Sequence, residues 1–238
     1  MTSPAAIKEL QVNLHSDFSK TACVATAQAR WQPSPQAGVE RIALDRIGDE
    51  VARATSLVRY AADSDFPAHV HGGGEEILVL EGVFSDEFGD YPVGSYLRNP
   101  PGSRHTPRSK PGCTLFVKLW QFAPDDRQQL CLDTRSMPWQ AGLVEGLSVL
   151  PLHEHQGVST ALVRWQPDTR FKLHSHPGGE EILVLEGELA DEAGIYPVGT
   201  WLRSPCGSRH QPFSPGGALI YVKVGHLAAR TCWDQRSS

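Results

Sequence analysis

Long apolar runs, paired cysteines and clusters of basic residues are all missing from this 238-residue sequence. No apolar stretch approaches the roughly 18 residues that a membrane-spanning helix needs, and residues 1–10 lack the charged and then apolar pattern of a signal peptide. The five cysteines are widely spaced and form no C-x-x-C pair, which argues against structural disulfides and a cysteine zinc site. We therefore expect a cytoplasmic protein.

The charge balance limits the classes of binding partner that we expect. The sequence has 22 Lys and Arg against 27 Asp and Glu, which gives a formal net charge of −5. Without a basic patch there is no electrostatic attraction for phosphate backbones or for an anionic membrane surface. We expect a small-molecule ligand or substrate, no nucleic acid and no membrane, and we leave assembly into a homodimer open.

What the sequence does contain is histidine, glycine and proline, at 10, 22 and 18 residues. Short apolar segments rich in β-branched residues alternate with Gly/Pro turns, a pattern typical of many short strands. No sustained helical periodicity is visible, so we predict an all-β protein, either a barrel or a double-sheet jelly roll. The clearest predicted strands in the first half are 41–44, 54–60, 77–80, 95–98 and 114–120.

The sequence contains two copies of one internal repeat. Residues 69–82 recur as 174–187, and each later residue follows its counterpart by 105 positions, as His174 follows His69. The stretch from Cys23 to Trp31 matches the stretch from Cys131 to Trp139 with a spacing of 108 instead. This change predicts three extra residues in the first copy, which we place near residues 33–35. Cys23 and Cys131 are expected to be buried.

We divide the chain accordingly into two homologous domains with short ends. The expected ranges are an N-terminal extension at 1–19, a first domain at 20–125, a second domain at 126–230 and a C-terminal tail at 231–238. The linker is placed at 123–127.

A metal site is predicted in each copy. His69 and His71 are two residues apart, so on a strand both imidazoles point to one face. The glycines at 72–74 allow a turn that brings Glu75 back toward them, and His105 follows a second turn. The predicted ligands are His69, His71, Glu75 and His105 in the first copy and His174, His176, Glu180 and His210 in the second. This donor set suits one divalent ion per domain, with Fe or Zn favoured and Mn or Ni also compatible.

Other charged residues recur in both copies. Three pairs of cations have two candidate roles, either reaching the cavity to hold a substrate or forming ordinary ion pairs: Arg98 and Arg203, Arg104 and Arg209, Lys118 and Lys223. By strand alternation, Glu76 and Glu181 should point away from the metal. His153 and His155 imitate the ligand spacing, but their counterparts in the first copy are Gly48 and Glu50, so we expect a polar hairpin tip there.

These motifs resemble the cupin superfamily. The H-x-H run with its Glu matches the first cupin motif through Gly82 and Gly187, and the G-x5-P-x-G-x2-H pattern ending at His105 and His210 matches the second. The resemblance implies two tandem double-stranded β-helix (jelly-roll) barrels, a bicupin. More narrowly, the sequence is similar to the cupin domain of ChrR-type anti-sigma factors. The sigma-binding domain of that family carries a C-x-x-C pair that this sequence lacks, so we do not expect it to bind a sigma factor.

Two functions from different classes remain open. The first is a non-haem Fe(II)-dependent dioxygenase that acts on a small enolisable carbonyl compound, since the resemblance extends to iron dioxygenases of the cupin fold. The second is a non-catalytic regulatory module of the oxidative-stress type, with a structural zinc ion. Ligand identity alone does not choose between them.

Overall fold

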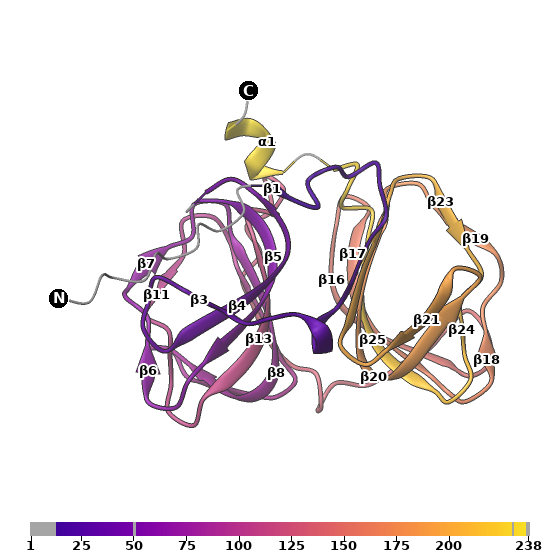
Figure 1. Cartoon of the computed structure of the whole chain (residues 1–238), viewed down its shortest axis with the longest axis horizontal. Coiled ribbons are helices and arrows are strands. Elements are labelled where there is room, and N and C mark those ends of the chain that lie inside the picture. The colour runs from indigo at the N-terminus through magenta and orange to yellow at the C-terminus, as the bar shows by residue number, and fades with distance from the viewer. Residues whose placement is uncertain (1–12, 50, 230, 237–238) are drawn as a thin grey trace.

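The computed structural model describes residues 13–49, 51–229 and 231–236. Residues 1–10, on which the signal-peptide analysis rests, and most of the expected N-terminal extension lie outside these ranges. The described chain forms two β-barrels side by side (Figure 1), which confirms the all-β tandem cupin fold. No helix in these residues has the length and apolarity to cross a membrane.

The first barrel is built around one large twisted sheet with the strand order β1-β4-β5-β13-β8-β10-β14. Its strands are β1 (Asn13–Leu14), β3 (Gln32–Pro33), β4 (Val39–Ile47), β5 (Arg53–Tyr60), β6 (Ser64–Asp65), β7 (His69–Val70), β8 (Glu75–Ser85), β9 (Asp90–Pro92), β10 (Ser95–Asn99), β11 (Arg104–His105), β12 (Arg108–Ser109), β13 (Cys113–Leu119) and β14 (Leu130–Asp133). The short pair β7 and β11 forms a separate two-stranded sheet.

The second barrel repeats this plan with the order β15-β16-β17-β25-β20-β22-β2. Its strands are β2 (Ala22–Ala25), β15 (Gln140–Ala141), β16 (Leu147–His155), β17 (Val158–Trp165), β18 (Thr169–Arg170), β19 (His174–His176), β20 (Glu180–Asp191), β21 (Gly194–Pro197), β22 (Thr200–Ser204), β23 (Ser208–His210), β24 (Phe213–Ser214) and β25 (Ala218–Val224). A 3-10 turn η1 (Thr26–Gln28) and a helix α1 (Cys232–Arg236) complete the described elements. In Figure 1, α1 lies above the first barrel.

The two barrels exchange strands. β2 lies between β1 and β3 of the first barrel in sequence, yet it pairs with β22 of the second barrel, with Cys23 opposite Leu202. Reciprocally, β14 follows the linker and pairs with β10 of the first barrel, with Cys131 opposite Leu97. The expectation that both cysteines are buried is wrong: they lie exposed on these two edge strands. Each barrel therefore completes its sheet with a segment from the other repeat.

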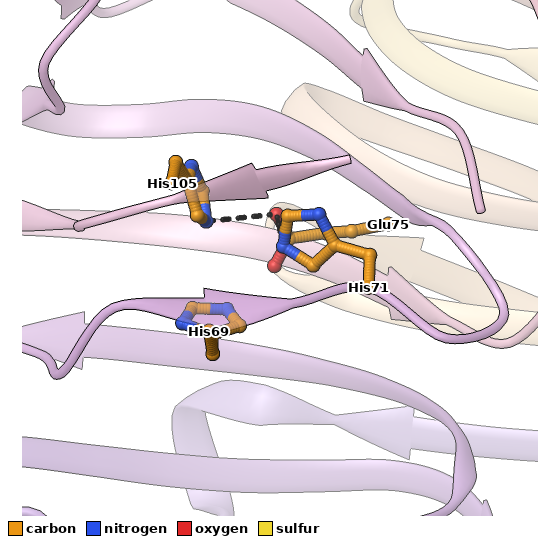
Figure 2. Close-up of side chains that lie close together, drawn as sticks. All are labelled: His69, His71, Glu75 and His105. Carbon is orange, nitrogen blue, oxygen red and sulfur yellow. Dashed lines mark ion pairs between the residues drawn. The ribbon is translucent and has the colours of Figure 1, made fainter. Parts of the chain in front are cut away.

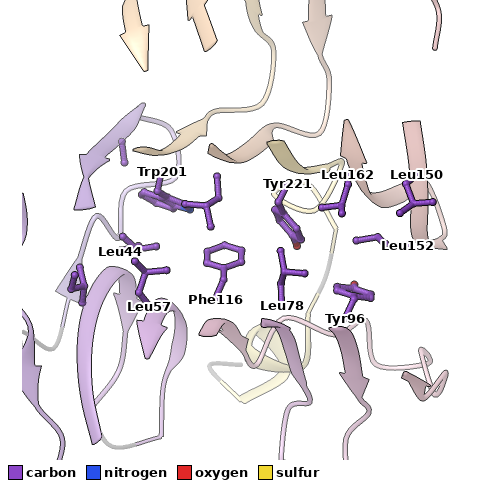
Figure 3. Close-up of a cluster of buried hydrophobic side chains, with 13 residues drawn as sticks. Leu44, Leu57, Leu78, Tyr96, Phe116, Leu150, Leu152, Leu162, Trp201 and Tyr221 are labelled. Atoms are coloured by element: carbon purple, nitrogen blue, oxygen red, sulfur yellow. The ribbon is translucent and has the colours of Figure 1, made fainter. Parts of the chain in front are cut away.

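The largest hydrophobic cluster lies between the barrels rather than inside one of them. Figure 3 shows the two sets of side chains facing each other, with Phe116 and Leu78 opposite Tyr221 and Leu162. The rings of Phe116 and Tyr221 meet edge to face at a centroid distance of 5.1 Å. Two smaller clusters fill the barrel interiors. The central strands are thus buried on both faces, which explains the unbroken apolar run at 77–80.

The strand register shows that the three extra residues of the first copy lie at a different place from the one predicted. Arg41 of β4 stands opposite Val58, whereas Val149 of β16 stands opposite Val163, so the 108 spacing persists through this strand. The predicted position near residues 33–35 is therefore wrong. The difference lies in the hairpin between β4 and β5, at residues 48–52, where the second copy has only Gln156 and Gly157.

Replacing Phe116 by alanine should lower the free energy of unfolding by about 3–5 kcal/mol, because it opens a cavity at the centre of the interface. Urea unfolding followed by tryptophan fluorescence measures this loss. The matched control is Phe88→Ala, which truncates a ring that is 70% exposed and should change stability by less than about 0.5 kcal/mol. Equal effects of the two substitutions would contradict a shared interface core.

Candidate metal centres

Each barrel gathers the four predicted ligands at one point. The ligand atoms of His69, His71, Glu75 and His105 all lie within 4.8 Å of one another, and so do those of the second set. In the first barrel, β7 and β11 pair with His69 directly opposite His105, while Glu75 begins the long strand β8. Figure 2 shows the imidazoles of His71 and His105 directed at the carboxylate of Glu75.

Glycines make the turn between the histidines and the glutamate possible. Gly74 has a φ of +80°, a left-handed conformation that other residues adopt only with strain. A Cβ atom on Gly73 would lie 2.2 Å from the ring of Trp120, so the turn and this ring pack in direct contact. In the second barrel the residue equivalent to Trp120 is Gly225, whose backbone packs against Gly178. A tryptophan ring therefore packs on the glycine turn in the first barrel alone.

Most imidazoles are held through the nitrogen that faces away from the cluster. In the first barrel, Nδ1 of His69 bonds to the Pro67 carbonyl at 3.0 Å and Nδ1 of His71 to the Ser103 hydroxyl at 2.9 Å. Nδ1 of His105 bonds to Asp86 at 3.2 Å. Such contacts fix ring orientation and leave Nε2 as the free ligand atom, an arrangement common around protein-bound metals.

Sequence reasoning missed the carboxylates behind two of these rings. Asp86 and its counterpart Asp191 lie 3.2 and 3.3 Å from Nδ1 of His105 and His210. Each aspartate also accepts a hydrogen bond from a tyrosine hydroxyl, at 2.9 Å in the first barrel and 2.8 Å in the second. Both aspartates keep the 105 spacing, so the repeat itself carried the signal that could have revealed them.

Two of the imidazole nitrogens that face the centre of the first cluster form no hydrogen bond within the described chain. Nε2 of His71 and Nε2 of His105 are buried without a hydrogen-bond partner among the described residues, although they lie 3.1 and 3.5 Å from Glu75 Oε2. In the second barrel, Nε2 of His176 lies 3.1 Å from Nε2 of His210. Buried imidazole nitrogens that point at a carboxylate and receive no hydrogen bond are suited to bind a cation held between them. Both clusters therefore suit a divalent metal.

The two carboxylates have different surroundings. Burial opposes ionisation of Glu75, but the approach of His71 and His105 and a 3.1 Å hydrogen bond from Asn99 lower its pKa to about 2. Burial and the nearby charge of Asp191 raise the pKa of Glu180 to about 8. Ser204 occupies the position of Asn99 in the second barrel. A bound cation would favour the carboxylate form at both sites.

Strand alternation separates the other recurring cations from the metal clusters. Glu76 is in register with Lys118 and Arg98, so these three side chains share the outer face of the sheet, opposite to Glu75. The same holds for the second-barrel triplet of Glu181, Lys223 and Arg203. The cavity role proposed from sequence therefore does not apply to Lys118, Arg98, Lys223 or Arg203. Arg104 and Arg209 are exposed on the far side of the short strands that carry His105 and His210.

These outer-face charges pair across the barrel interface. Nζ of Lys118 lies 2.6 and 2.7 Å from the carboxylate oxygens of Glu181. Reciprocally, Nζ of Lys223 lies 2.5 Å from Glu76, which also accepts a hydrogen bond from Tyr221. As expected, the two glutamates point away from the metal ligands, and the structure adds that each one meets the lysine of the other barrel.

The arginines and two histidines extend this network. Arg98 pairs with Asp126 of the linker at 2.5 Å, and Arg203 pairs with Asp45 at 2.9 Å. His153 lies 3.3 Å from Asp126, and Nε2 of His226 lies 3.0 Å from Glu181. The predicted hairpin tip is therefore wrong for His153, which is buried at the interface, where its strand position corresponds to Asp45.

Comparison with known proteins agrees with this architecture. A family model described as the ChrR cupin-like domain matches residues 19–123 and again residues 127–228. The chain belongs to the ChrR cupin-like family. No curated protein matches its sequence.

Several solved structures resemble this ChrR cupin-like chain. A "putative dioxygenase" from Nostoc punctiforme has 17% identity and a TM-score of 0.72, over 89% of this chain and 85% of that chain. A "putative glyoxylate induced protein" from Pseudomonas aeruginosa has 12% identity and a TM-score of 0.71, over 94% and 93%. A single-residue variant of oxalate decarboxylase from Bacillus subtilis has 13% identity and a TM-score of 0.61, over 89% and 78%. At these identities the likeness establishes the fold alone.

Replacing Asn99 by serine, the residue of the second barrel, should weaken zinc binding at the first site about tenfold, because Glu75 loses its orienting hydrogen bond. Equilibrium dialysis on a His174→Ala/His176→Ala background measures the first site alone. The unmodified chain should bind two ions, and the reciprocal Ser204→Asn substitution should strengthen the second site. An affinity unchanged within twofold in the Asn99→Ser protein would contradict this role of Asn99.

The interface should weaken as the pH falls below 6.5. Burial lowers the pKa of His226 from 6.5 to about 4. Between these values the unfolded chain binds a proton that the folded chain does not, so folded stability is lost with falling pH. The loss should be about 2 kcal/mol at pH 5 for this histidine.

Thermal unfolding between pH 8 and 5 tests this prediction. His226→Gln keeps a donor for Glu181 but does not titrate, so its melting temperature should fall less steeply with pH than that of the unmodified protein. His155→Gln is the matched control, because His155 is half-exposed and lies outside this buried network. Identical pH profiles for His226→Gln and the unmodified protein would refute the coupling.

Proposed function

We propose that the protein is a metal-dependent enzyme, a non-haem Fe(II) dioxygenase that acts on a small enolisable carbonyl compound. The observation that carries this proposal is that each ligand cluster opens into its own cavity. The cavities measure about 440 Å³ in the first barrel and about 610 Å³ in the second, and ligand histidines line both of them. Structural zinc sites are closed by four protein ligands, whereas a site beside a cavity has room for substrate.

The chain's own residues would prepare the site for this chemistry. Three imidazoles and one carboxylate would hold the metal and leave coordination positions toward the cavity. Fe(II) bound there would act as a Lewis acid toward a chelating carbonyl and react with dioxygen. The Asp86 carboxylate fixes the ring of His105, and apolar side chains such as Val117 and Ile77 form part of the cavity wall. A low-polarity wall strengthens the charge interactions inside it.

Neighbouring folds support an enzyme, and the family description favours the alternative. A solved structure of similar fold is described as a "putative dioxygenase", and another as an oxalate decarboxylase. The alternative is a non-catalytic regulatory module with structural zinc, which the sequence resemblance to ChrR-type anti-sigma factors implies; the match to the ChrR cupin-like domain is the observation on its side. The cavities favour the enzyme over the regulatory module, because a purely structural metal site does not need a cavity beside it.

Oxygen uptake decides between these functions. Protein reconstituted anaerobically with Fe(II) should consume oxygen on a panel of diketones and hydroxyketones at least about tenfold faster than the same concentration of free iron. His71→Ala/His176→Ala, which removes one ligand from each cluster, should reduce uptake to that of free iron. Uptake no faster than free iron across the panel would refute the proposal. Tight zinc retention without any turnover would then support the regulatory module.

A further inference from the structure

The two cavities share their ligands but differ in the side chains that face them. The register of β4 and β16 places Arg41 in the first barrel where Val149 stands in the second. The next strand places Tyr60 where Trp165 stands. Arg41 and Tyr60 line the first cavity, and Val149 and Trp165 line the second. The first interior is thus polar and cationic at positions where the second is apolar.

A second arginine, Arg46, lines the first cavity and lies in the same row of cross-strand neighbours as the ligand Glu75. Arg46 stands opposite Ala54, Ala54 opposite Leu119, and Leu119 opposite Glu75, so this row crosses the inner face of the sheet to the ligand glutamate. Arg46 is only 4% exposed and lines the cavity. Its counterpart in the second barrel is Glu154, which is exposed and does not line that cavity.

Neither arginine is neutralised by an ion pair within the described residues. Arg41 donates to the Ser34 hydroxyl at 2.9 Å. Arg46 donates to the backbone carbonyls of Gly48, at 3.0 Å, and Asp49. The Asp49 carboxylate is near enough to favour the charged form of Arg46 but makes no ion pair with it.

The two guanidinium groups are also close enough to repel each other. Burial lowers the pKa of Arg46, and the charge of Arg41 lowers it further. Burial raises the pKa of Tyr60; the carboxylate of Glu75 raises it further, and the charge of Arg41 lowers it, so this phenol lies near both the ligand cluster and Arg41. Glu75 also lines this cavity, but its carboxylate contacts His71, His105 and Asn99 and makes no ion pair with either arginine. Two like charges that face one cavity without a paired carboxylate are unfavourable until an anion enters. A guanidinium pairs best with a planar carboxylate, through two parallel hydrogen bonds.

We propose that the first-barrel cavity binds a small carboxylate anion through Arg41 and Arg46 beside the metal ligands, whereas the second cavity takes an uncharged apolar ligand. The second cavity has Val149 and Trp165 at the two positions where the first has Arg41 and Tyr60, and the one lysine in its lining, Lys172, is exposed. This inference rests on the proposed function in that the anion would be the substrate of the first site. Anion binding itself can be measured without turnover.

Malonate is a suitable probe, with uncharged malonamide as its matched control. Isothermal titration on zinc-loaded protein avoids oxygen chemistry. His174→Ala/His176→Ala leaves the first site loaded, and His69→Ala/His71→Ala leaves the second. Malonate should bind at least about tenfold more tightly to the first of these proteins than to the second, and malonamide should show no such preference. Equal malonate affinity for the two proteins would overturn the proposal.

Arg41→Met, which keeps most of the aliphatic stem, should weaken malonate binding at the first site at least tenfold. Arg104→Met removes the same charge from the exposed face of β11 and should leave the affinity within twofold. Arg41→Lys, which keeps the charge but loses the planar fork, should fall between them, and it serves if Arg41→Met does not fold. Unchanged affinity in the folded Arg41 variants would refute the role of Arg41. Malonate binding without oxygen uptake on any substrate would refute the dioxygenase and leave the anion site standing.

Discussion

The rest of the structure depends on the buried charge pairs between the barrels. Glu76 and Glu181 are almost completely buried, and each receives a lysine from the opposite barrel. A buried carboxylate without its partner costs about 3–5 kcal/mol. Arg98 of the same barrel also lies 3.1 Å from Glu76 but is shared with Asp126, so each barrel relies on the lysine of the other to complete the neutralisation. Because the pairs are reciprocal, Lys118 and Lys223 can both reach their partners in one relative orientation of the barrels. The surrounding apolar cluster supplies the burial, and the charges select the orientation.

Strand alternation ties this interface to the metal centres. Glu75 faces the ligand cluster and Glu76, the next residue, faces the other barrel. The same two adjacent glutamates recur at 180 and 181. The residue that follows each ligand glutamate is therefore anchored by an ion pair with the other repeat, and this helps to fix the position of the ligand carboxylate. The exchanged strands β2 and β14 extend the same dependence to the sheet edges. Each metal centre is supported by both halves of the sequence.

The features of the site that depend on short sequence spacings could be predicted from the sequence. The H-x-H pair, the glycine turn and the repeat were sufficient for both ligand clusters, and alternation was sufficient to turn Glu76 away from the metal. The strand exchange was not predictable, because pairing of β2 with β22 joins residues about 180 positions apart, and no local pattern specifies it. The three-residue difference was misplaced because the pair Val39 and Glu40 recurs as Val144 and Glu145. Only the register shows that Val39 aligns with Leu147.

The distribution of differences between the repeats follows from this dependence. The buried glutamates and lysines that pair across the interface are the same in both repeats, because a change in one member would leave a buried charge on the other barrel. Uncharged interface positions are less constrained, as Phe116 and its counterpart Tyr221 show. Interior positions face a cavity and have no such partner. There the repeats differ, with Arg41 against Val149, Tyr60 against Trp165 and Trp120 against Gly225. The shared interface therefore holds two similar metal centres in place while leaving the surroundings of each free to recognise a different ligand.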